Sequence, residues 1–103
     1  MRYTQETGAL ISKAEIAHGI FDVTVQVPRI AAAASPGKFV NILCDGHTLR
    51  RPISICGFDA AQGTLRLVFE VRGKGTDWLS KREVGDVLDM TGPLGHGFSL
   101  TDS

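Results

Sequence analysis

The sequence has 103 residues, 43% of them hydrophobic, and its 11 lysines and arginines balance 11 aspartates and glutamates. Such a chain can bury one core but is too short for two domains of ordinary size, so we treat residues 1–103 as a single domain. The neutral balance excludes a general attraction to nucleic acid or anionic membranes, and no apolar run reaches the roughly 20 residues of a membrane span. Residues 1–6 lack the apolar core of a signal peptide, so we expect a cytoplasmic protein.

Short apolar runs separated by turn residues predict strands along most of the chain. In order, we expect strands within residues 9–17 and at 21–27, 39–44, 53–58, 64–71 and 87–90. The alternation of apolar and polar residues is clearest in FDVTVQV at 21–27 and in TLRLVFEV at 64–71. Six such strands predict an all-β sandwich or barrel, and a barrel is favoured because closure removes exposed strand edges.

Two segments do not follow the strand pattern. Ala31–Ala34 favours a helix by composition, but it lies between Pro28 and Pro36, which leaves little room for a stable helix. We therefore predict a surface loop there. Thr76–Arg82 is predicted as a short helix with Thr76 as its N-cap, an acidic residue in its first turn and basic residues in its last.

The segment Gly73-Lys74-Gly75-Thr76 leads into that predicted helix. Glycines at a helix start let a ligand approach the backbone closely, and the first N–H groups of the helix point toward it. The segment is therefore a candidate phosphate cradle. It matches neither G-x-G-x-x-G nor a Walker sequence, so a tight turn into a helix is the alternative.

The segment Arg50-Arg51-Pro52-Ile53-Ser54 places two arginines before a proline that opens an apolar strand. Proline holds the preceding residue in an extended conformation, which fixes the direction of the Arg51 side chain and suits bidentate binding of phosphate. Ser54 adds a hydroxyl two residues after Pro52, on the same face of a strand. Alone, this segment is more typical of an exposed basic turn. Together, the two segments would place a diphosphate between an arginine and a helix N-terminus.

The remaining reactive side chains lack the spacing of a known site. Cys44 and Cys56 do not form a metal-binding pair and are expected to be buried thiols. His18 and His47 are expected to be solvated loop residues, and Trp78 to fill the core or an interface. We find no nucleophile–base pair and no paired catalytic carboxylates.

Four segments resemble, in order and spacing, the FAD domain of the ferredoxin-reductase-like family. They are Arg51-Pro52-Ile53-Ser54, Val68-Phe69-Glu70, Gly73-Lys74-Gly75-Thr76 and Gly92-Pro93-Leu94-Gly95-His96-Gly97-Phe98. The resemblance covers nearly the whole chain. Within the family, the chain is most similar to the electron-transfer subunits of two-subunit bacterial dihydroorotate dehydrogenases. The last segment is shared with NAD(P)H-dependent ferredoxin oxidoreductase subunits.

The resemblance implies a six-stranded antiparallel Greek-key barrel with one short helix, and FAD as the cofactor. It implies that Arg51 binds the FAD diphosphate, that Ser54 lies near the reactive nitrogen of the flavin ring, and that Phe69 packs by the ring. Gly75 and Thr76 match the pair that holds the diphosphate at the helix start. The implied FAD-binding residues are Arg51, Pro52, Ile53, Ser54, Val68, Phe69, Glu70, Gly75 and Thr76.

The chain departs from the family pattern in two respects. Glu70 stands where many relatives carry arginine, and a carboxylate there would repel the diphosphate unless it points elsewhere. In the family, a nicotinamide-binding domain follows the GPLG segment, and in the dihydroorotate members a cysteine-rich stretch then ligates a [2Fe–2S] cluster. Two cysteines cannot supply the four thiolates of such a cluster. Because these 103 residues lack the nicotinamide-binding domain, we expect the isolated chain not to oxidise NADH.

The function implied by the resemblance is that of an FAD-binding electron-transfer domain of an NAD(P)H-dependent oxidoreductase in pyrimidine biosynthesis. The implied partner is the FMN-containing catalytic subunit of dihydroorotate dehydrogenase, and NAD(P)H would bind to another domain. We expect no nucleic-acid or membrane partner, and a homodimer stays open. The alternatives are the FAD domain of a related NAD(P)H–ferredoxin oxidoreductase, or a structural or protein-interaction barrel that has lost flavin binding.

Overall fold

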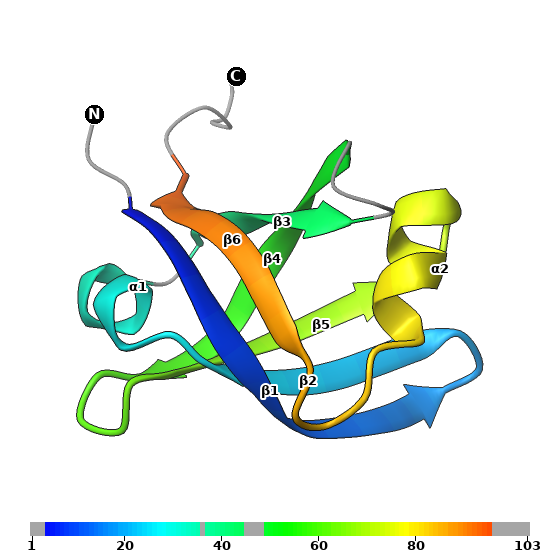
Figure 1. The fold of residues 1–103 in the computed structure, drawn as a ribbon, viewed down its shortest axis with the longest axis horizontal. Coiled ribbons are helices and arrows are strands. Elements are labelled where there is room, and N and C mark those ends of the chain that lie inside the picture. Colours follow the sequence, from blue (N-terminus) through cyan, green and yellow to red (C-terminus); the bar gives the residue numbers. More distant parts are fainter. Residues whose placement is uncertain (1–3, 36, 45–48, 96–103) are drawn as a thin grey trace.

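The computed structural model describes residues 4–35, 37–44 and 49–95, and its strands close into one antiparallel barrel (Figure 1). The elements are β1 (Thr4–Ala17), β2 (Ile20–Gln26), α1 (Pro28–Ala33), β3 (Phe39–Cys44), β4 (Leu49–Asp59), β5 (Thr64–Glu70), α2 (Lys74–Ser80) and β6 (Val87–Leu94). The strand order around the barrel is β1-β2-β5-β4-β3-β6. Because β3, β4 and β5 are successive neighbours and β6 returns beside β3, the predicted Greek-key barrel is confirmed.

The two longest strands, β1 and β4, each pair with different partners along their length. Residues 4–9 of β1 pair with β6, and from Leu10 onward β1 pairs with β2. Residues 49–54 of β4 pair with β3, and from Ile55 onward β4 pairs with β5. The register is irregular after Leu10 and again after Ile55. Bulges of this kind bend a strand from one sheet into the next, so β1 and β4 form the corners of the barrel.

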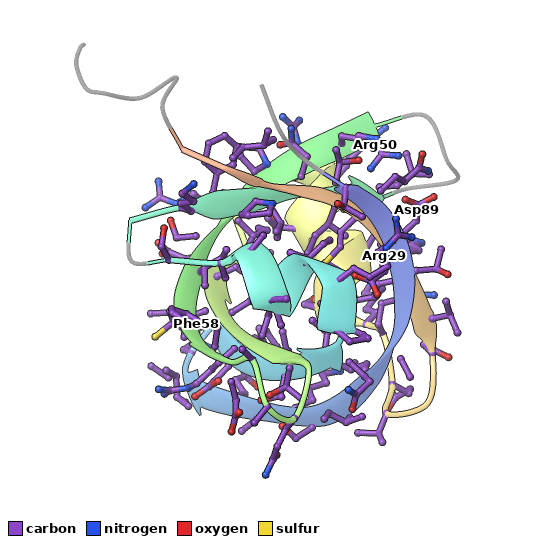
Figure 2. All side chains as sticks on the ribbon, turned by 90° about the vertical axis from the view of Figure 1, so that its left-hand side faces the viewer. Arg29, Arg50, Phe58 and Asp89 are labelled. Carbon is purple, nitrogen blue, oxygen red and sulfur yellow. The ribbon has the colours of Figure 1, made fainter. Side chains whose placement is uncertain are left out.

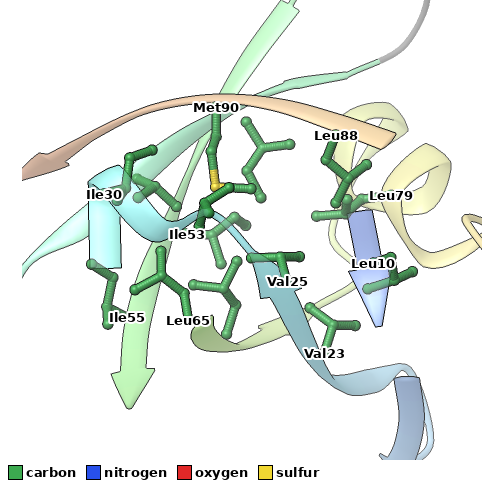
Figure 3. Close-up of a cluster of buried hydrophobic side chains, with 14 of the residues drawn as sticks. Leu10, Val23, Val25, Ile30, Ile53, Ile55, Leu65, Leu79, Leu88 and Met90 are labelled. Atoms are coloured by element: carbon green, nitrogen blue, oxygen red, sulfur yellow. The ribbon is translucent and has the colours of Figure 1, made fainter. Parts of the chain in front are cut away.

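Inward-facing aliphatic residues from all six strands fill the barrel (Figure 3). The predicted alternation is confirmed in β2, where Val23 and Val25 are buried, and in β5, where Leu65, Leu67 and Phe69 are buried. Every described residue of the core is apolar. The barrel is therefore a solid core, and any ligand site lies on its outside or at its ends.

Helix α1 lies across one end of the barrel (Figure 2), where we predicted a surface loop at Ala31–Ala34. That prediction was wrong. Ile30 and Ala31 are fully buried in the barrel end, so packing stabilises a helix that is too short to form alone. The missing N-cap comes from β1, because the Glu6 carboxylate accepts hydrogen bonds from the N–H groups of Arg29 (3.2 Å) and Ile30 (2.9 Å).

Helix α2 lies at the opposite end of the barrel (Figure 1), so the described residues form two helices and not the one that we predicted. It begins two residues earlier than predicted, and Gly73 is its N-cap in place of Thr76. Leu79 enters the core, and Trp78 packs half-buried against it beneath the Arg82 guanidinium, 4.2 Å from the ring centroid. Neither described helix is long and apolar enough to cross a membrane.

Several smaller predictions are also decided by the structure. His18 is exposed in the β1–β2 turn and Cys44 is buried, as predicted. Cys56 is exposed, which corrects the expectation of a buried thiol: it lies at the bulge of β4, where the register with β5 shifts between Ile55 and Gly57. His47 and His96 lie outside the described residues.

We expect Ile30→Ala to lower the free energy of unfolding by about 2–4 kcal/mol, the usual cost of truncating a fully buried isoleucine. Urea unfolding followed by circular dichroism measures this change. The control is Arg29→Ala, an exposed neighbour on the same helix, which should change stability by less than about 0.5 kcal/mol. Equal effects of the two substitutions would show that α1 does not seal the barrel end.

Candidate functional site

The candidate site lies where β4 and β5 stop pairing with each other. Their ladder runs from the pair Asp59–Thr64 to the pair Ile55–Leu67. At residues 49–54, which precede Ile55, β4 pairs with β3. Beyond Leu67, β5 continues to pair with β2 as far as Glu70. Pro52 has no N–H and cannot donate to a neighbouring strand, which suits a segment where the ladder has ended. The divergence of the two strands opens a hollow on the outer face of the barrel.

Two adjoining hollows occupy this region. The first, which we call the strand groove, has a volume of about 210 Å³ and lies between the two strands. It is lined by Pro52, Ile53, Ser54, Val68, Phe69, Glu70, Arg72 and Thr76. The second, the helix groove, has a volume of about 330 Å³ and lies at the start of α2. It is lined by Arg51, Pro52, Arg72, Gly73 and Thr76.

The two grooves share three lining residues, Pro52, Arg72 and Thr76, and so adjoin each other. The structure brings together all four residues of the Arg51-Pro52-Ile53-Ser54 segment, the Val68-Phe69-Glu70 segment and Thr76. Gly75, the remaining predicted residue, lies buried beneath them and lines neither groove. Arg72 was not predicted from the sequence, because it belongs to none of the segments that suggested the site.

Arg51 is an exposed cation in the helix groove. Among the described residues, its guanidinium has no hydrogen-bond or ion-pair partner. Its stem packs against Gly75, where an added Cβ would lie 2.7 Å from Cγ and 3.1 Å from Nε of Arg51. Only glycine leaves this space free. Gly75 therefore contributes the room in which the Arg51 stem packs, and not backbone flexibility.

The Thr76 hydroxyl holds the turn that leads into α2. It accepts hydrogen bonds from the N–H groups of Arg72 (2.8 Å) and Gly73 (3.1 Å), and donates to the Gly73 carbonyl at 3.3 Å. The hydroxyl is therefore occupied. The first N–H groups of the helix have no acceptor within the helix itself, so the backbone is the part of this turn that can still donate to a ligand.

Glu70 and Arg72 form an ion pair at the junction of the grooves. Arg72 Nη2 lies 2.8 Å from Glu70 Oε1, and the side chains are 79% and 50% exposed. The Glu70 carboxylate is therefore partly neutralised by its own neighbour Arg72.

Phe69, an inward-facing core residue, forms part of the floor of the strand groove. Phe69 is buried, and its ring stacks on Phe21 with 5.7 Å between centroids and 19° between planes. Lys13 Nζ lies 5.6 Å from the Phe21 centroid. Ser54 is exposed above this floor and carries the groove's outward-facing hydroxyl from β4.

A second ion pair on β5 lies outside both grooves. Arg66 donates to the Asp22 carboxylate from Nη2 at 2.7 Å and from Nε at 3.0 Å. These hydrogen bonds lower the pKa of Asp22 below its ordinary value. Among the residues that the structure describes, no three His, Cys, Asp or Glu side chains are grouped to hold a metal ion. Among the described residues, the charged side chains that line the two grooves are Arg51, Arg72 and Glu70.

Comparison with known proteins matches this chain to one family over most of its length. The profile of the oxidoreductase FAD-binding domain matches residues 7–98. The electron transfer subunit of dihydroorotate dehydrogenase B (NAD(+)) from Bacillus mycoides (strain KBAB4) is 37% identical over 97 residues, and that from Bacillus cereus (strain B4264) is 36% identical. Each match covers 91% of this chain, which spans only 38% of the length of these relatives.

Solved structures agree on the fold. The NADH-dependent reduced ferredoxin-NADP oxidoreductase superposes with a TM-score of 0.79 at 32% identity, over 84% of this chain and 32% of that one. The ferredoxin reductase of carbazole 1,9a-dioxygenase superposes with a TM-score of 0.78 at 23% identity, over 92% of this chain and 30% of that one. The second similarity supports the barrel fold alone.

We expect Gly75→Ala to act through Arg51. In an Arg51→Ala background, alanine should stabilise the helix by about 0.5–1 kcal/mol, the ordinary gain over glycine. In the unaltered chain, overlap with the Arg51 stem should turn this gain into a loss of about 1–2 kcal/mol. Urea unfolding of the four proteins measures the coupling. Equal effects of Gly75→Ala in the two backgrounds would contradict the packing of Arg51 on Gly75.

Proposed function

Because the chain belongs to the oxidoreductase FAD-binding domain family, we propose that its strand groove and helix groove together form the FAD site. FAD joins a flavin ring to a diphosphate through a ribityl chain, so its site needs an apolar surface beside a cationic one. The observation that carries the proposal is the adjacency of two surfaces: apolar strand residues Ile53, Val68 and Phe69 in one groove, and in the other Arg51, whose guanidinium has no ion-pair partner among the described residues.

In this proposal, Arg51 holds the diphosphate, since guanidinium matches phosphate oxygens bidentately. The backbone N–H of Thr76, which lines the helix groove, completes the contact, while the Thr76 hydroxyl keeps the turn in shape. Gly75 also leaves room for the Arg51 stem. Binding of the FAD diphosphate in the helix groove would thus depend on the Arg51 side chain and on the backbone at the start of α2.

The flavin end of the cofactor is assigned to the strand groove. Ser54 offers a hydroxyl for a hydrogen bond near the reactive nitrogen of the ring. Phe69, Ile53 and Val68 provide apolar contact, with Pro52 at the junction of the two grooves. When bound, FAD supplies the redox chemistry, accepting a hydride and releasing single electrons, and the protein supplies position and electrostatics.

We infer that the whole protein is the electron-transfer subunit of a dihydroorotate dehydrogenase, acting in pyrimidine biosynthesis with an FMN-containing catalytic subunit. The relatives named above support this assignment. NAD(P)H and a [2Fe–2S] cluster would be bound by other parts of such a protein, so the isolated chain should not oxidise NADH. A cytoplasmic location belongs to the same proposal, and the exposed thiol of Cys56 suits a reducing compartment.

A second candidate is the FAD domain of an NAD(P)H–ferredoxin oxidoreductase. It is favoured by the structural similarity to the NADH-dependent reduced ferredoxin-NADP oxidoreductase, at 32% identity. Both candidates use the same FAD site and differ in the protein that receives the electrons.

Arg51→Ala should weaken FAD binding by about 1.5–3 kcal/mol, the scale of a charged hydrogen bond. Isothermal titration of the flavin-free chain with FAD measures the change. Arg50→Ala is the matched control, since Arg50 neighbours Arg51 but pairs with Asp89 and lines neither groove. Unchanged affinity in Arg51→Ala would remove Arg51 from the site, and failure of the unaltered chain to bind FAD would favour the structural barrel.

The full-length protein that contains this chain should copurify with an FMN-containing dihydroorotate dehydrogenase subunit when the two are expressed together. Size-exclusion chromatography with absorbance at the flavin bands detects such a complex. Absence of this complex, together with reduction of ferredoxin by NAD(P)H, would favour the second candidate.

A further inference from the structure

Arg72 occupies a position that the proposed FAD site leaves without a role. It lines both grooves, and so lies at the boundary between their cationic and aromatic parts. It comes from the connection between β5 and α2, whereas Arg51 comes from β4. The helix groove is therefore bounded by guanidinium groups from two separate segments of the chain.

The backbone of Arg72 is held while its side chain is left accessible. Its N–H donates to Thr76 Oγ1 at 2.8 Å, which ties the start of the side chain to the turn. The Arg72 side chain is 79% exposed and, within the part of the chain that the structure describes, makes one ion-pair contact, from Nη2 to Glu70. Such an exposed single-point pair contributes little to stability, so the guanidinium can exchange Glu70 for a stronger anion at small cost.

We propose that Arg72 is a second ligand of the cofactor diphosphate, and that Glu70 competes with the cofactor for it. This inference rests on the proposed FAD site. A diphosphate diester carries two negative charges, which Arg51 and Arg72 together would balance. Phosphate oxygens also match the planar fork of a guanidinium that a single contact to Glu70 leaves largely unused.

The competition has a direction that can be measured. Glu70 lines the strand groove and holds Arg72 by one contact. Removing its charge would release Arg72 and also remove a negative charge from the cofactor's surroundings. Removing Arg72 would do the opposite, leaving the Glu70 carboxylate unneutralised beside the diphosphate. The two substitutions should therefore change FAD affinity in opposite senses.

Titration of the flavin-free chain, followed by quenching of flavin fluorescence, tests the role of Arg72. Arg72→Ala should raise the Kd for FAD by about 3- to 10-fold and the Kd for riboflavin, which has no phosphate, by less than about twofold. The matched control is Arg66→Ala, which removes the same charge from an ion pair on β5 outside both grooves. Circular dichroism and thermal unfolding verify that each variant is folded.

Glu70→Gln tests the competition directly. It should lower the Kd for FAD by about 2- to 5-fold, and this gain should vanish when Arg72→Ala is also present. Asp22→Asn is the matched control, since it removes a carboxylate from the pair that lies outside the grooves.

The outcomes separate this inference from the proposal on which it rests. If the unaltered chain does not bind FAD, the proposed function fails and the role of Arg72 fails with it. If the unaltered chain binds FAD but Arg72→Ala behaves like Arg66→Ala, Arg72 is not a ligand and only this inference is overturned. It is likewise overturned, with the FAD site left standing, if Arg72→Ala weakens FAD and riboflavin equally or if Glu70→Gln fails to tighten binding.

Discussion

The change of partner by β4 at Ile55 is the feature on which the site depends. One strand serves two sheets, and the ladder that joins it to β5 stops where it turns toward β3. A strand paired on both sides along its whole length would leave no space for the strand groove. Proline at position 52 fits this arrangement because the segment has no β5 ladder to support. The strand groove is thus a consequence of the bend that takes β4 from one sheet into the other.

Much of the fold could be predicted because the barrel has an apolar interior and a more polar exterior, so apolar and polar residues alternate along its strands. Alternation in β2 and β5 marks which residues face inward, and those residues are buried. Helix α1 could not be predicted in this way, because its stability comes from burial of Ile30 and from a cap supplied by Glu6, which lies far away in the sequence. The misplaced N-cap of α2 has a similar origin, since the Thr76 hydroxyl turns back to bind Arg72 and Gly73 instead of starting the helix.

In the candidate site, too, residues within local sequence motifs could be predicted, whereas roles that depend on contacts between distant segments could not. Segment motifs identified most residues that line the two grooves, because each motif combines a backbone constraint with a side chain suited to phosphate or flavin. Arg72 belonged to no motif, and its importance emerges only when both grooves are seen to share it. Likewise, the supporting role of Gly75 depends on the path of the Arg51 stem, which no sequence pattern specifies.

Closure of the barrel joins its first strand to its last, since residues 4–9 of β1 pair with β6 (Figure 1). During synthesis, β1 leaves the ribosome first and must wait for nearly the whole domain before this partner exists. Contacts so distant along the chain form slowly, and an unpaired strand edge invites pairing with the wrong chain in the meantime. β6 must therefore emerge from the ribosome before residues 4–9 of β1 can pair.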